Sequence, residues 1–120
     1  MGWRFWAVLI SISGIVVLNG CSMNLKSGRV TYEQNCAQCH GVTGLGDGTF
    51  ADKLITPPSD LTALARNNAG AFPALYVTDV IDGYARSDHF SGAMPEFGPA
   101  LGGEELRLGP LVDYIESLQR

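Results

Sequence analysis

The stretch Cys36-Ala37-Gln38-Cys39-His40 decides how the rest of this 120-residue chain is interpreted. Two thiols three positions apart on a helical turn point the same way, because residues at that spacing share one face. Such a pair can add to two neighbouring vinyl groups of one flat ring, and His40 then presents its imidazole beneath that ring. Cys-x-x-Cys-His is the attachment motif of c-type haem, so we predict one covalent haem c with His40 as the proximal iron ligand.

The same cysteine pair fits three other chemistries less well. A zinc site needs two further ligands, and only Cys21 and His89 remain to supply them. A thioredoxin-like redox pair needs alternating strands and helices, which the pattern of apolar residues does not indicate. A structural disulfide between Cys36 and Cys39 would close only a very short loop.

The length and composition suit one small domain with one haem. Apolar residues make up 46% of the chain and charged residues 17%, as is ordinary for a globular protein. A domain of this size is only marginally stable by itself. A buried haem would give its core a large apolar surface on which to close.

Residues 1–20 have the layout of a lipoprotein-type secretory signal peptide. One charged residue, Arg4, precedes an apolar run over 7–18 that is short for a membrane span. The chain is therefore expected to be exported and to be periplasmic or otherwise extracytoplasmic.

The four residues Leu18-Asn19-Gly20-Cys21 resemble the lipobox of bacterial lipoproteins, in which a small residue precedes a cysteine that becomes the new N-terminus. That resemblance implies cleavage after Gly20 and a lipid anchor on Cys21. Lipidation would also remove the odd third thiol of an exported protein. An uncleaved anchor and a conventional signal cleaved nearby are the alternatives.

The mature chain is expected to be acidic. Without residues 1–20 it would carry seven Lys and Arg against twelve Asp and Glu, a formal charge of −5. This charge disfavours nucleic acid and anionic lipid headgroups as partners. Membrane association would therefore come from acyl chains, and redox partner proteins would be expected to present a basic docking face.

Apolar periodicity predicts an all-α haem domain over 29–120, joined to the cysteine by a short polar tether over 21–28. The expected helices span residues 29–38, 60–66, 73–84 and 110–119. Ser27 is a plausible cap for the first of them. Because Gly109-Pro110 interrupts the last apolar stripe, we expect an irregular turn before Pro110 and a helix that starts there.

Taken together, these segments resemble a monohaem class I cytochrome c over about residues 28–118. In that family a first helix ends in the Cys-x-x-Cys-His motif, a methionine loop follows later, and a C-terminal helix crosses the first. The resemblance implies the cytochrome c fold, with three to five helices around one haem. Met94-Pro95 follows His40 by 54 positions, where the resemblance implies the sixth iron ligand.

The resemblance also implies roles for a proline, a leucine and the helix crossing. Pro58, or else Pro57, would offer its carbonyl to the second nitrogen of His40, and Leu61 would pack on the haem. An extra residue between proline and leucine, compared with the commonest form of the family, leaves the choice of proline open. The residues expected to meet at the crossing are Gly28 and Tyr32 on one side and Leu111, Tyr114 and Ile115 on the other.

A saturated iron would make the chain an electron carrier and not an enzyme. With His40 and Met94 on the two faces, the iron has no open position for a small-molecule substrate, and thioether ligation raises its potential. His89, in a loop, is the rival sixth ligand. Two other functions stay open: a gas sensor or haem enzyme with a labile sixth ligand, and a haem-bearing accessory subunit of a larger redox complex.

Overall fold

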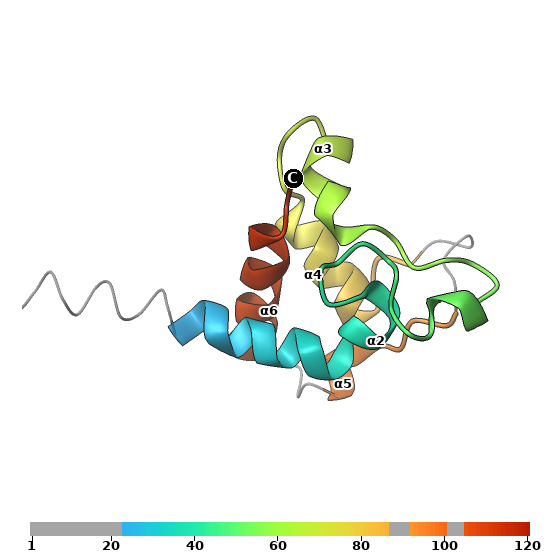
Figure 1. Ribbon diagram of the computed structural model, residues 1–120. Helices are drawn as coiled ribbons and strands as arrows, with labels where there is room; N and C mark the ends of the chain where they lie inside the picture. Colours follow the sequence, from blue (N-terminus) through green and yellow to red (C-terminus); the bar gives the residue numbers. More distant parts are fainter. Residues whose placement is uncertain (1–22, 87–91, 101–104) are drawn as a thin grey trace, which may run out of the picture.

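The regular structure of the chain is helical (Figure 1). The computed structural model describes residues 23–86, 92–100 and 105–120, and these three ranges contain no strand. The predicted all-α fold is thereby confirmed. Cys21 and His89, two residues with predicted roles, lie outside the described ranges.

The first helix begins earlier than predicted. Residues 23–35 are helical, and a turn at Cys36 leads into α2 (Ala37–His40). The predicted start at position 29, after a polar tether, was therefore wrong. The prediction started the helix after Gly28, because a glycine destabilises a helix by about 1 kcal/mol. In the structure Gly28 is buried where another helix packs against it, and the helix continues through it.

Gly28 marks the place where the first helix meets α6 (Glu105–Ser117). Figure 1 shows that the two helices run in different directions and cross where they meet. A methyl group on Gly28 would run into the carbonyl group of Pro110, so glycine is what lets the two backbones approach so closely. Beside this contact the rings of Tyr32 and Tyr114 lie 5.3 Å apart, measured between their centroids. The crossing that the sequence predicted is thus present.

The last helix is longer than predicted, because Pro110 lies inside α6. Proline removes one helical hydrogen bond and costs about 3 kcal/mol in a helix interior. Continuing the helix before Pro110 buries Leu108 beside Leu111, and burying a leucine is worth about 1.5–3 kcal/mol. Leu108 alone thus offsets at most the cost of the proline, and α6 also contributes Leu111, Val112 and Ile115 to the buried core. A helix therefore stands where the sequence predicted an irregular turn.

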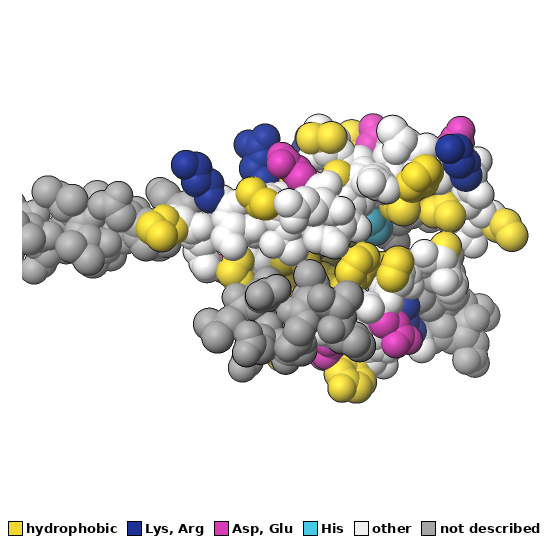
Figure 2. Space-filling model, turned by 90° about the horizontal axis from the view of Figure 1, so that it is seen from below, with side chains coloured by type: hydrophobic (Ala, Val, Ile, Leu, Met, Phe, Trp, Pro, Cys, Tyr) yellow, Lys and Arg dark blue, Asp and Glu magenta, His cyan; other side chains and the backbone are white. Residues whose placement is uncertain are grey.

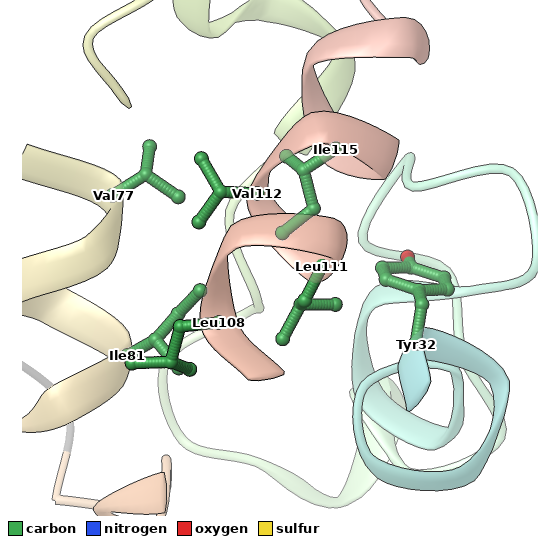
Figure 3. Close-up of a cluster of buried hydrophobic side chains, with 7 residues drawn as sticks. All are labelled: Tyr32, Val77, Ile81, Leu108, Leu111, Val112 and Ile115. Atoms are coloured by element: carbon green, nitrogen blue, oxygen red, sulfur yellow. The ribbon is translucent and has the colours of Figure 1, made fainter. Parts of the chain in front are cut away.

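The buried core joins the first helix, α4 (Ala74–Asp82) and α6. Val77 and Ile81 of α4 lie toward one side of α6, and Tyr32 lies on its other side (Figure 3). The predicted helix over 73–84 corresponds to α4. The core cluster consists of Tyr32, Val77, Ile81, Leu108, Leu111, Val112 and Ile115.

Two connecting segments complete the described fold. The chain between His40 and α4 contains, in order, η1 (Ala51–Lys53), η2 (Leu61–Ala63) and α3 (Leu64–Asn67). Asp60 caps η2, since its carboxylate accepts hydrogen bonds from the Thr62 amide at 2.8 Å and the Thr62 hydroxyl at 2.6 Å. After α4, the short helix α5 (Phe97–Ala100) packs against it. Residues of both segments line one cavity.

Candidate haem site

A largely apolar cavity of about 290 Å³ lies beside the core. Its walls come from α2, from the loop over 54–61, from α4 and from the segment 93–97. Figure 2 shows this face, where hydrophobic side chains gather on both sides of a hollow in which a histidine is visible. The six predicted cofactor-binding residues all line the cavity: Cys36, Cys39, His40, Pro58, Leu61 and Met94.

The two cysteines of the motif are carried by one turn of backbone. The amide groups of Cys39 and His40 both donate hydrogen bonds to the carbonyl of Cys36, at 3.1 and 2.9 Å. Neither thiol is engaged in a disulfide. Burial raises the pKa of Cys36 to about 12, so its sulfur stays a neutral thiol. A neutral thiol at Cys36 disfavours zinc binding and thiolate exchange, because both use the thiolate.

The imidazole of His40 is oriented by a backbone carbonyl. Its Nδ1 lies 3.0 Å from the carbonyl oxygen of Ser59. Because a carbonyl can only accept, Nδ1 carries the proton and Nε2 keeps its lone pair for a metal. Burial lowers the pKa of His40, and the hydrogen bond to Ser59 opposes that effect in part. The ring is therefore neutral at pH 7 and has the tautomer that a haem iron requires.

The carbonyl partner of His40 corrects the prediction, which named Pro58 or Pro57. The accepting residue is Ser59, two positions before Leu61. The extra residue between proline and leucine shifts the register by one position, so the serine carbonyl takes the place expected for a proline. Pro58 and Leu61 both still line the cavity.

Backbone hydrogen bonds hold the Ser59 loop in this register. The Leu61 amide donates to the carbonyl of Gly44 at 2.7 Å, and the Gly46 amide donates to the carbonyl of His40 at 2.8 Å. Gly46 has a φ of +83°, and a Cβ on it would run into the carbonyl of Pro58. Glycine at position 46 therefore lets the loop fold back tightly beneath the histidine.

Met94 reaches the cavity from a different segment of the chain than His40 does. Its side chain is partly buried and packs against the edge of the core. Val80 and Ile81 of α4 and Phe97 line the cavity beside it. Two unpaired thiols, a neutral imidazole and a thioether around one apolar cavity form a donor set that fits a covalently attached haem.

Sequence reasoning missed two residues that shape this site. Ser59 could have been found from its spacing to Leu61, if it had been considered together with Pro57 and Pro58 as the carbonyl partner of His40. Arg86 gave no signal, yet it donates hydrogen bonds to the carbonyl groups of Met94 and Pro95, at 2.7 and 2.6 Å. Its partners are backbone atoms brought near by folding, and no side-chain motif marks such contacts.

A comparison with known protein families decides the family of the chain. Residues 23–115, well over half of the chain, match the family described as cytochrome c oxidase, cbb3-type, subunit III. The chain belongs to this family. It is therefore a c-type cytochrome, consistent with the monohaem class I resemblance. Searches of curated proteins and of solved structures returned no match.

Membership of the family carries general consequences for this cytochrome. A domain of this kind is an electron carrier that holds haem c, works with redox partner proteins and generally lies outside the cytoplasm. Within the described ranges, no helix has the length and apolar character needed to cross a membrane.

Proposed function

We propose that this cytochrome transfers electrons through a single haem c, attached at Cys36 and Cys39 and ligated by His40 and Met94. The observation that carries the proposal is that these four side chains line the same apolar cavity, although Met94 is distant from the motif in sequence. A bound haem would supply an iron that accepts and releases one electron. The chain would supply its attachment, its axial ligands and its shielding from water.

The residues around the cavity support a carrier with a filled coordination sphere. The Ser59 carbonyl holds the His40 ring in one orientation and makes Nε2 more basic, because it accepts a hydrogen bond from the Nδ1–H group. A thioether from Met94 would favour ferrous iron and raise the reduction potential. Apolar walls act in the same direction, since they disfavour the more highly charged ferric state. His40 and Met94 would together fill the two axial positions of a bound haem iron. Such an iron could change between its ferric and ferrous states but would have no open position for a substrate.

Carbon monoxide separates the carrier from a gas sensor or haem enzyme. We expect the dithionite-reduced holoprotein to show an unchanged absorption spectrum under carbon monoxide, and to be reoxidised reversibly by ferricyanide. A methionine-bound ferrous iron has no vacancy for the gas. An immediate carbon monoxide adduct in the native protein at neutral pH would contradict the proposed ligand set and favour the sensor or enzyme.

A second candidate function is that of a haem-bearing subunit within a larger redox complex. The matched family is described as an oxidase subunit, which is the observation that favours this alternative. Purification from detergent-solubilised membranes distinguishes the two. A carrier is expected to elute alone at moderate ionic strength. Salt screens the contacts between its acidic surface and the basic face of a partner, and these contacts alone would hold the two proteins together. Stoichiometric co-purification of a large partner at high salt would indicate the subunit.

We further propose that a lipid on Cys21 anchors the protein to a membrane. The helix is already formed at position 23, so a tether that starts at Cys21 would be much shorter than the sequence predicted. Two residues extend at most about 7 Å, compared with roughly 25 Å for seven extended residues. The haem domain would consequently stay at the bilayer surface and exchange electrons with partners in or on that membrane.

Cell fractionation of wild type and Cys21→Ser tests the anchor. Wild type is expected to sediment with membranes and to resist washing with high salt, because acyl chains and not charge would hold it. The Cys21→Ser variant is expected to move almost entirely to the soluble extracytoplasmic fraction with its haem intact. If that variant keeps its haem and still sediments with membranes, the lipid anchor is rejected.

A further inference from the structure

Arg86 joins the end of α4 to the segment that carries Met94. Its Nη1 donates a 2.7 Å hydrogen bond to the carbonyl of Met94, and its Nη2 donates a 2.6 Å hydrogen bond to the carbonyl of Pro95. Its Nε and Nη2 each lie 3.3 Å from the carbonyl oxygen of Val80, in the last turn of α4. One planar guanidinium thus bridges three carbonyl groups from two segments.

The chemistry of the Met94-Pro95 linkage makes this bridge important. Proline has no N–H, so the peptide group between the two residues can be fixed by hydrogen bonding only through the carbonyl of Met94. Arg86 occupies that acceptor. The carbonyls in the last turn of a helix lack helical partners, and a cation there meets the negative end of the helix dipole. The guanidinium of Arg86 therefore makes favourable contacts both with the Met94 carbonyl and with the end of α4.

Close packing brings the rest of the same segment against α4. A Cβ on Gly98 would run into the carboxylate of Asp82, and a Cβ on Gly83 would lie 2.9 Å from Cγ of Glu96. These contacts bring the two elements together, but they do not orient the peptide groups beside Met94. The hydrogen bonds from Arg86 do, because they are directional and charge-assisted.

We propose that Arg86 is a positioning residue, which holds the Met94 backbone so that the thioether stays on the haem iron. The inference rests on the proposed ligation by His40 and Met94, and it deepens that proposal. Losing the bridge would let the segment move and would make Met94 easier to displace. The haem attachment would be unaffected, since Cys36 and Cys39 lie on another element.

Imidazole titration of the purified ferric holoprotein tests this role. For Arg86→Gln we expect the apparent dissociation constant for imidazole to fall about ten- to hundredfold, the range for losing hydrogen bonds to a charged group. The absorption band that marks thioether-bound ferric iron should disappear at correspondingly lower imidazole. Arg86→Lys keeps the charge but cannot bridge three carbonyls, so its apparent dissociation constant for imidazole should also fall, by at least a few-fold.

Arg29→Gln is the matched control, because it removes the same charge from an exposed residue that pairs with Glu33 at 2.8 Å. It should bind imidazole as wild type does. If Arg86→Gln and Arg86→Lys both bind imidazole as wild type does, the positioning role is rejected. Should Arg86→Gln fail to fold, Arg86→Lys alone carries the test.

A double-mutant comparison shows whether Arg86 acts through the methionine. In a Met94→Leu background no thioether remains to be held, so adding Arg86→Gln should change imidazole affinity less than twofold. An undiminished effect there would overturn the proposal, since the arginine would then act on the haem or on access to it. A wild-type protein without the thioether band would instead refute the ligation on which the inference rests. If wild type shows the thioether band and both Arg86 variants bind imidazole as wild type does, only the positioning role of Arg86 is refuted.

Discussion

Replacing both Cys36 and Cys39 with serine is expected to abolish covalent haem attachment. Each thioether bond uses one of the two thiols, and serine cannot form either bond. Extraction of the purified protein with acidified organic solvent should leave essentially all haem on the wild-type polypeptide and essentially none on the double variant. The readout is the haem absorption in the protein pellet compared with that in the organic phase.

Single variants and a third thiol serve as controls for this experiment. Cys36→Ser and Cys39→Ser should each keep at most one bond, which shows as a shift of the reduced α-band of the alkaline pyridine haemochrome toward that of a haem with one vinyl group. Cys21→Ser should keep both bonds, because Cys21 is not part of the motif. Haem that survives acid extraction in the double variant would show that the attachment site has been assigned wrongly.

Met94→Ala is expected to have the second largest effect, because it removes the proposed sixth ligand. The thioether-to-iron absorption of the ferric protein should vanish, and the ferrous protein should bind carbon monoxide. The reduction potential should fall by on the order of 0.1 V or more, within the roughly 0.8 V range that axial ligands set in haem proteins. Absorption spectroscopy and a potentiometric titration measure these changes.

Two further variants test whether the effect of Met94→Ala comes from the lost sulfur ligand. Truncating a partly buried methionine also opens a cavity, at a cost of about 2 kcal/mol. Met94→Leu keeps the volume at a cost below about 1.5 kcal/mol but offers no sulfur, so it should show the same spectroscopic loss. His89→Ala should change none of these properties. If His89→Ala loses the native ligand signature while Met94→Ala keeps it, the assignment of the sixth ligand is reversed.

Several features of this cytochrome could be predicted from the sequence because they depend on local spacing. Two thiols and a histidine within five positions identify the haem motif, since one helical turn is enough to bring them together. The helix α4 was predictable because its apolar residues repeat at helical spacing. Met94 is a different case, because it was proposed from the resemblance to class I cytochromes c, which places a methionine followed by a proline at this distance after the histidine.

Other features were decided only by contacts between distant segments. The first helix includes Gly28 because that glycine lets α6 approach, and α6 includes Pro110 because the longer helix buries Leu108. Both residues disfavour helix locally, and tertiary packing outweighs that preference. The carbonyl that orients His40 belongs to Ser59, because the surrounding backbone hydrogen bonds set the register of the loop. The sequence by itself therefore determined which side chains were predicted for the site, and these line one cavity. The tertiary structure decided which backbone carbonyls contact them, because every residue carries a carbonyl and only folding selects among them.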